Sequence, residues 1–288
     1  MMKRFFKILG YVMFGIFVGT ALIVYRFPYD TLAKRIEAEA SQRFGCELSI
    51  EELGYRFPLS LAFSRMTIET REQGFAEQVV LNSGQLRPRR LSLLSRKLAA
   101  GFAGNLFSGR VYGLFELDPL LGPESYALDL RLESIDLAGL EIPGKIAMLS
   151  SLQGSLSGVW QLQGSLRNVM ETSGSGKMAI NQASLELAPP GINSIQLREL
   201  EGEGDFALEK HRLDIDQIAF TGRGVKGKAQ GRASLENPLD QSRLELEGTI
   251  DFTSEAPQLY SLVRKYMQKT SIPFVLQGPL QRLEYRLK

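Results

Sequence analysis

The sequence predicts a mainly β protein, in which one long, curved and mostly antiparallel sheet follows a single apolar N-terminal segment and carries about three short helices. Apolar and polar residues alternate strictly along several segments, most clearly Tyr126–Glu133, as in strands with one buried and one solvated face. The 28 glycines fall between or within such segments, as a sheet with many tight turns requires. The long apolar runs and crossover helices of parallel βαβ winding are missing from the pattern.

The first segment, Ile8–Val24, contains no charged residue. With Tyr25 it reaches about 18 residues, within the ~17–25 that a membrane-spanning helix needs. Lys3, Arg4 and Lys7 precede it, so the positive-inside rule predicts a cytoplasmic N-terminus. The apolar side chains expected to form this membrane anchor are Ile8, Leu9, Val12, Phe14, Ile16, Phe17, Val18, Leu22, Ile23 and Val24.

Two alternatives to an anchor are a cleaved signal peptide and a buried helix of a soluble protein. The apolar run is longer than the usual ~7–15-residue core of a signal peptide, and no small-residue cleavage motif precedes Arg26. We therefore expect residues 1–26 to form a cytoplasmic stub and transmembrane anchor. Residues 27–288 are expected to form one β domain on the far side of the membrane, in contact with lipid at its base.

The composition excludes some classes of protein. Hydrophobic residues make up 44% and charged residues 23%, as in a globular protein rather than a disordered one. Lys and Arg total 34 against 32 Asp and Glu, and the resulting net charge of +2 gives no electrostatic reason to expect a nucleic-acid partner. Cys46 is the single cysteine, so an oxidising compartment is permitted but not indicated.

A second helix is expected directly after the anchor. Pro28 disfavours helix at the residue before it, and Asp30 is a suitable N-cap for a helix over Thr31–Phe44 that ends at Gly45. We expect this helix to pack on the end of the β domain, with partner binding as the alternative. Its narrow apolar stripe consists of Leu32, Ile36, Ala40 and Phe44, with Ala33 beside it.

From Glu47 onward the period of the apolar residues falls to two, and roughly fifteen short strands are expected. Segments expected to be separate strands include 126–133, 177–180, 184–187, 213–215 and 218–220.

Two short helices are expected between these strands, over Leu91–Leu98 and from Pro257 to about Met267. The first is flanked by a basic cluster that is either a solvated edge or a contact with anionic headgroups or an acidic partner. This cluster consists of Arg87, Arg89, Arg90, Arg96 and Lys97.

No pattern in the sequence indicates an enzyme. His211 is the single histidine and stands in an expected turn, without a nucleophile nearby in the sequence. Gly222–Gly227 matches a dinucleotide-binding fingerprint, but the helix that this motif needs is replaced by an alternating segment. Asp214 and Asp216 have no histidine or cysteine cluster beside them. We expect no catalytic residue, no cofactor and no metal.

The sheet itself is the remaining candidate. If its apolar face curves without closing, it forms a groove that suits acyl chains, which gain ~0.8 kcal/mol for each buried CH₂. The alternative is that the two halves of this face pack on each other. The residues expected to line such a groove are Tyr126, Leu128, Leu130, Leu132, Trp160, Leu162, Leu244, Leu246, Ile250, Phe252, Phe274 and Leu276.

Several stretches, taken in order, suggest a family. An apolar anchor is followed by Phe27–Leu32, a helix ending in Arg43–Gly45, the strand Leu48–Ile50 and the phrase Tyr55–Leu61, and the chain closes with Ile272–Leu280. This arrangement resembles the type II secretion system protein N family, and its last segment is similar to the closing strand of the wider AsmA-like group. The likeness spans nearly the whole chain but contains no catalytic signature.

The resemblance implies a single-pass inner-membrane protein of Gram-negative bacteria, with its N-terminus in the cytoplasm and its body in the periplasm. It implies a non-enzymatic component of type II protein secretion that binds other components of that apparatus. Similarity to the AsmA-like group implies a half-barrel or groove and, as the alternative function, phospholipid binding or transfer between the inner and outer membranes.

Overall fold

The structure is a computed structural model. It describes residues 11, 13–15, 18–19, 22, 24–44, 46–57, 60–70, 78–92, 97–118, 124–140, 149–168, 171–187, 195–236, 242–255, 271–279 and 283–287.

One α-helix, one short 3₁₀ helix and fifteen strands follow one another in the described chain, after the helical residues that precede Phe27. They are α2 (Tyr29–Phe44), β1 (Cys46–Glu51), β2 (Gly54–Arg56), β3 (Ser60–Thr70), β4 (Gln78–Ser92), β5 (Lys97–Leu106), β6 (Gly109–Asp118), β7 (Ser125–Asp136), η1 (Leu137–Leu140), β8 (Leu149–Ser165), β9 (Ser173–Leu187), β10 (Ile195–Glu209), β11 (Arg212–Gly222), β12 (Val225–Ser234), β13 (Arg243–Phe252), β14 (Ser271–Pro279) and β15 (Glu284–Leu287).

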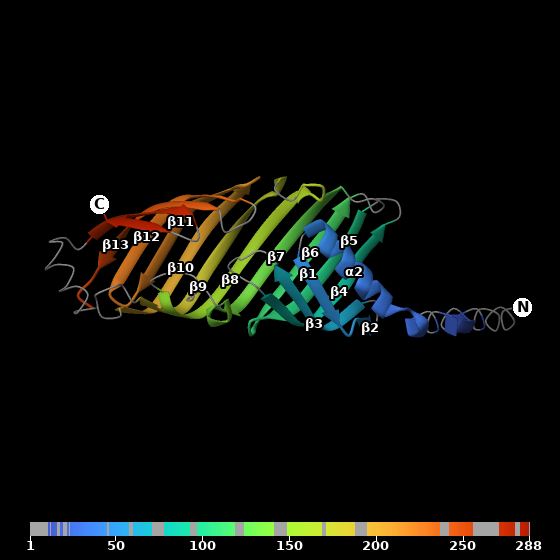
Figure 1. The fold of residues 1–288 in the computed structure, drawn as a ribbon. Helices are drawn as coiled ribbons and strands as arrows, with labels where there is room; N and C mark the ends of the chain where they lie inside the picture. Colours follow the sequence, from blue (N-terminus) through green and yellow to red (C-terminus); the bar gives the residue numbers. More distant parts are fainter. Residues whose placement is uncertain are drawn as a thin grey trace, which may run out of the picture.

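All fifteen strands belong to one antiparallel sheet. The strand order is β1-β3-β4 and then the order of the sequence through to β15, and the short β2 pairs with β3. Figure 1 shows this meander as an elongated body with α2 at one end and β13 near the other. The predicted class, a mainly β protein built on one long antiparallel sheet, is confirmed.

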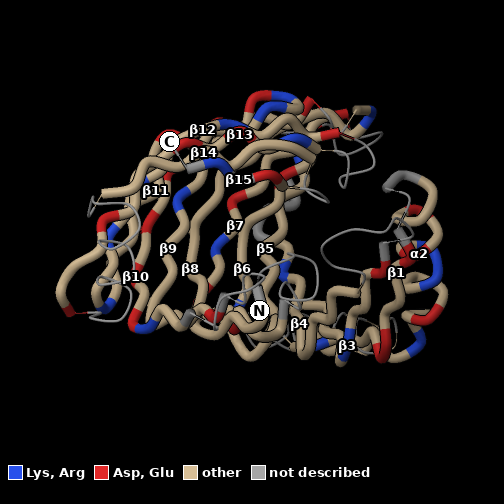
Figure 2. The backbone as a smooth tube through the Cα atoms, turned by 60° about the vertical axis from the view of Figure 1, so that its left-hand side comes forward, with Lys and Arg blue, Asp and Glu red and all other residues tan. Residues whose placement is uncertain are grey.

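The sheet is strongly curved, also as predicted. In Figure 2 the backbone bends from β3 and β4 at the bottom, through β10 and β11 at the left, to β12, β13 and β14 at the top. Bulges contribute to this curvature because an extra residue bends the strand that carries it. Ser83, Ser134 and Glu199 have positive φ angles of 54°, 52° and 55°, and each stands where the register shifts.

The strands are longer than the sequence predicted. β8 has 17 residues, and β9 joins the segments 177–180 and 184–187, which were expected to be separate. β11 likewise joins 213–215 and 218–220 across a register shift between Ile215 and Ile218. The predicted breaks were wrong because each bulge interrupts the two-residue period without ending the strand.

α2 packs on the N-terminal end of the sheet, as predicted. Ala33 of the helix is buried together with Leu53 and Phe63, and the backbone N–H of Ile50 donates a hydrogen bond to Glu37 Oε1 at 2.7 Å. The helix begins at Tyr29, so Asp30 lies in its first turn and the predicted cap at Asp30 was wrong. Around this core lie the partly buried side chains of Leu32, Ile50, Leu61, Met66 and Leu81.

The helix predicted over Leu91–Leu98 was also wrong. β4 continues to Ser92 and β5 begins at Lys97, with Leu91 directly opposite Leu98 in the register. The leucine spacing that suggested a helix is therefore that of a hairpin, with one leucine on each strand. The helix predicted from Pro257 to Met267 lies outside the described residues.

Among the residues that the structure describes, no helix has the length and apolar character to cross a membrane. Of the predicted anchor residues, Phe14, Val18, Leu22 and Val24 are described and helical. Those that lie outside the described residues are Ile8, Leu9, Val12, Ile16, Phe17 and Ile23.

Candidate functional site

The structure brings the predicted groove residues together on one face of the sheet, which we call the apolar face. Leu130 pairs with Trp160 and Leu128 with Leu162 across β7 and β8. Leu246 pairs with Leu276 across β13 and β14. All twelve predicted residues are half-buried and belong to cross-strand rows that share this face: Tyr126, Leu128, Leu130, Leu132, Trp160, Leu162, Leu244, Leu246, Ile250, Phe252, Phe274 and Leu276.

These rows continue without a charged side chain from β5 to β14. Directly opposed residues point to the same side of a sheet. Between β5 and β14 the central row extends from Phe102 to Leu276, and every member is apolar or glycine. Its members are Phe102, Gly113, Leu130, Trp160, Gly176, Phe206, Ile215, Gly231, Leu246 and Leu276.

Aromatic rings cover glycines on this face in a repeated arrangement. In five cross-strand pairs an aromatic residue stands directly opposite a glycine, and a Cβ on the glycine would overlap the ring. Each ring therefore lies flat over the neighbouring strand instead of standing upright. The pairs are Phe63 with Gly84, Phe102 with Gly113, Trp160 with Gly176, Phe220 with Gly227 and Phe274 with Gly248.

Trp160 also reaches across Gly176 to the next strand but one. Its ring stacks on Phe206 of β10, with 5.7 Å between the ring centroids and 29° between the ring planes. Side chains two strands apart can meet in this way because the intervening glycine has no side chain between them. At the centre of the apolar face, the rings of Trp160 and Phe206 therefore form a flat, continuous aromatic surface.

The exposed fractions of residues of the same type on the two faces show which face lies on the inner side of the curved sheet. Val111 on the apolar face is 5% exposed, whereas Val159 on the opposite face is 45% exposed. Ala229 on the apolar face is buried, whereas Ala127 on the opposite face is exposed. Side chains converge on the inner side of a curved layer and spread on its outer side, so these differences indicate that the sheet bends toward its apolar face.

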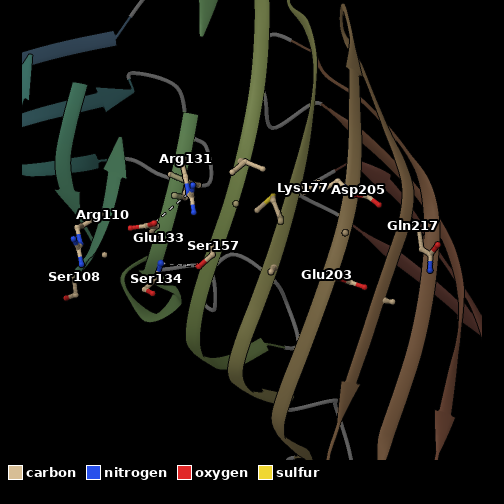
Figure 3. Close-up of a pocket in the computed structure, with 18 residues that line it drawn as sticks. Ser108, Arg110, Arg131, Glu133, Ser134, Ser157, Lys177, Glu203, Asp205 and Gln217 are labelled. Atoms are coloured by element: carbon tan, nitrogen blue, oxygen red, sulfur yellow. Dashed lines mark hydrogen bonds and ion pairs between the residues drawn. The ribbon is translucent and has the colours of Figure 1, made fainter. Parts of the chain in front are cut away.

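The opposite face, which we call the polar face, carries exposed charges in a shallow hollow of about 770 Å³. Figure 3 shows its labelled side chains on β6 to β11 and in the turn before β6, among them Arg131, Lys177 and Asp205. Lys177 Nζ lies 3.2 Å from Asp205 Oδ1, and both side chains are largely exposed. Exposed pairs of this kind contribute at most ~1 kcal/mol and are typical of a solvated surface.

Tyr112 and Glu133 form a side-chain contact on this surface. The Tyr112 hydroxyl donates a hydrogen bond to Glu133 Oε1, and the guanidinium of Arg131 lies 5.8 Å from the centroid of the Tyr112 ring. The bond to the Glu133 carboxylate, more than burial, raises the pKa of Tyr112 above its usual value. These contacts connect three neighbouring residues of β6 and β7.

The other sequence motifs lie in turns and strands of the described sheet. His211 is exposed in the turn between β10 and β11. Gly222–Gly227 forms the hairpin from β11 to β12, where Gly224 has a φ of 80°, so a strand and not a helix follows the motif. Asp214 accepts hydrogen bonds from Nε and Nη2 of Arg212 at 2.9 Å and 2.7 Å. The described residues contain no group of three or more potential metal ligands.

Comparison with models of protein families, with curated proteins and with solved structures finds no match for this chain. The assignment of a function therefore depends on the residues and on the geometry of the sheet.

Proposed function

We propose that the protein is a non-enzymatic lipid-binding protein that holds phospholipid acyl chains on its apolar face and conducts them between the inner and outer membranes. The observation that carries this proposal is the continuous, uncharged and half-buried surface that extends over β5 to β14. Burial of a CH₂ group on such a surface contributes ~0.8 kcal/mol, so a chain of ordinary length gains several kcal/mol.

Half-burial of large apolar side chains along the whole face favours an occupant. Monomeric soluble proteins rarely expose contiguous apolar patches larger than a few hundred Å². A charged or polar partner would leave its own groups unsatisfied against this face, because its rows supply no ionic counterpart. Acyl chains need only apolar contact, and they tolerate a surface without fixed hydrogen-bonding positions.

Exposed apolar side chains before Phe27 support a location at a membrane. Phe14 is 66% exposed and Leu22 is 56% exposed, while the Tyr25 side chain is 88% exposed. Water is an unfavourable environment for such a series, whereas lipid satisfies it. We therefore retain the proposal of an inner-membrane anchor with the β body in the periplasm.

Photo-crosslinking in living cells tests the lipid proposal with the complete chain. Leu162 and Gln161 are neighbours on β8 that point to opposite faces, and each is replaced in turn by photoreactive benzoylphenylalanine. Mass spectrometry is expected to find phospholipid adducts for the Leu162 position and not for the Gln161 control. Equal yields at both positions, or adducts at Gln161 alone, would contradict the proposal.

A second candidate function is a role as a component of type II protein secretion. The specific observation that favours it is Phe57, which is 85% exposed at the end of β2, within the phrase Tyr55–Leu61 that carries the family resemblance. Large exposed aromatic residues are typical anchors of protein interfaces. Loss of copurifying secretion components and of secreted protein in a Phe57→Ala strain would support this role. Unchanged secretion in a strain that lacks the whole protein would exclude it.

A further inference from the structure

The two ends of β7, which lie on opposite long rims of the apolar face, differ in chemistry. One rim carries Glu124, Tyr126, Arg167, Thr172 and Lys210, and we call it the polar rim. Arg167 Nη2 donates a hydrogen bond to Glu124 Oε1, which links the hairpin before β7 to the hairpin after β8. Both side chains of this pair are exposed, so the polar rim is open to water at this point.

At the other end of β7 the rim carries buried apolar side chains, and we call this stretch, Ile135–Gly139 together with Phe107, the apolar rim. Ile135 is 2% exposed and Leu137, at the start of η1, is 4% exposed. A Cβ on Gly139 would lie 2.7 Å from the Phe107 ring, so η1 is in close contact with the turn between β5 and β6. The backbone N–H of Asp136 donates to the carbonyl of Phe107 at 2.9 Å, which fixes this contact.

A pair of hydroxyl groups marks the boundary between the polar rim and the apolar face. Tyr126 Oη and Thr172 Oγ1 are 2.6 Å apart, Thr172 is 7% exposed and Tyr126 is half-buried. A tyrosine that places its ring on an apolar surface and its hydroxyl on a polar partner is the usual residue at the boundary of a hydrocarbon phase. Tyr126 is also the first of the residues on β7 that point to the apolar face.

The geometry points to one orientation of the bound lipid, an inference that rests on the proposed function. A diacyl phospholipid lies with its acyl chains parallel to the strands, its glycerophosphate headgroup at the polar rim beside Tyr126, and its terminal methyl groups toward the apolar rim. At ~3.4 Å per strand residue, the face from Tyr126 to Leu132 is roughly 20 Å long. One leaflet's acyl chain occupies about 15 Å, half of the ~30 Å hydrocarbon core.

The charges of the polar rim favour a zwitterionic headgroup. Glu124 and Arg167 supply both signs within one contact, and Lys210 lies near Glu209 and Arg212 at the following hairpin. A phosphate and an ammonium group can each find an opposite charge there, so no excess of anionic lipid is required. Binding is therefore expected to depend only weakly on salt concentration.

Trp160 is the single tryptophan and reports the depth of the lipid. It stands opposite Leu130, four residues along β7 from Tyr126, which corresponds to about 14 Å from the polar rim. The complete chain is reconstituted in phosphatidylcholine vesicles brominated either near the carboxyl end or near the methyl end of the acyl chains. Bromine near the methyl end is expected to quench Trp160 at least twofold more strongly.

A moved reporter gives the matched control. The double variant Trp160→Phe, Tyr126→Trp places the tryptophan at the polar rim, and the order of quenching is expected to reverse. If this variant does not fold, the comparison of the two lipids with Trp160 alone still decides the orientation. Quenching by neither lipid would overturn the proposed function itself. Equal quenching by both lipids, or stronger quenching of Trp160 by carboxyl-end bromine, would overturn the orientation while leaving lipid binding intact.

Discussion

Two aromatic-over-glycine pairs of the same sheet have different surroundings. Phe63 lies over Gly84 under α2, and it is 8% exposed in a core with Ala33 and Leu53. Phe220 lies over Gly227 in the middle of the sheet and is only half-buried. The same local arrangement is therefore covered by the chain's own helix at one end and left partly uncovered elsewhere.

This difference shows what the apolar face requires. At the N-terminal end an amphipathic helix satisfies the face, and Glu37 fixes that helix through its bond to the N–H of Ile50. The described elements supply no such cover over β7 to β14, and the side chains there have the same chemistry as those under α2. A lipid occupant would take the place that α2 takes at the end.

The largest expected effect is on the free energy of unfolding, and it compares the covered Phe63 with the half-buried Phe220. Phe63→Ala removes a buried ring from a packed core and is expected to lower the free energy of unfolding by about 3–5 kcal/mol. Phe220→Ala removes a half-buried ring and is expected to cost about half as much in lipid-free protein. Chemical denaturation of both variants measures the difference. Equal costs would show that the middle of the face is as well covered as the end.

A glycine substitution tests whether the Trp160 ring lies flat on the neighbouring strand. Gly176→Ala places a methyl group where the Trp160 ring lies, so the ring has to rise from the sheet. We expect a loss of about 1–3 kcal/mol and a shift of Trp160 emission to longer wavelength. Gly54→Ala is the control, since nothing lies within 4 Å of the added Cβ. An unchanged emission spectrum in Gly176→Ala would contradict the ring placement.

The smallest effect concerns the polar face, which needs no cover. The hydrogen bond from Tyr112 to Glu133 raises the pKa of Tyr112. The bond therefore stabilises the fold below the ordinary tyrosine pKa of about 10, and this stabilisation is lost as the pH rises through the pKa of Tyr112 in the folded protein. This pKa is obtained by subtracting the spectrophotometric titration curve of the Tyr112→Phe variant from that of the wild-type protein. In Glu133→Gln it is expected to fall toward the ordinary value, and no change would contradict the assigned cause.

The sequence predicts the faces of the strands better than their ends. The alternation in Tyr126–Glu133 is strict, so the face of every predicted groove residue on β7 is correct. At Ser134 the chain takes a positive φ and the next apolar residue, Ile135, comes three positions after Leu132 instead of two. A pattern of period two necessarily breaks there, although the strand continues through the bulge.

The pairing of aromatic residues with glycines could not be predicted from the sequence. Trp160 and Gly176 are distant in the chain, and only the register of β8 with β9 brings them together. The helix predicted over Leu91–Leu98 was wrong for a related reason, because leucines three and four residues apart fit a helix and a hairpin equally well. Long-range pairing decides both cases, and local periodicity contains no information about it.

The most direct test of the central claim is a crosslinking series along the apolar face. Photoreactive benzoylphenylalanine is placed in turn at Phe102, Leu130, Leu213 and Leu246, which sample β5, β7, β11 and β13. A continuous lipid-filled face predicts phospholipid adducts at all four positions in cells. Adducts at none of them would contradict the claim, and so would adducts confined to one strand.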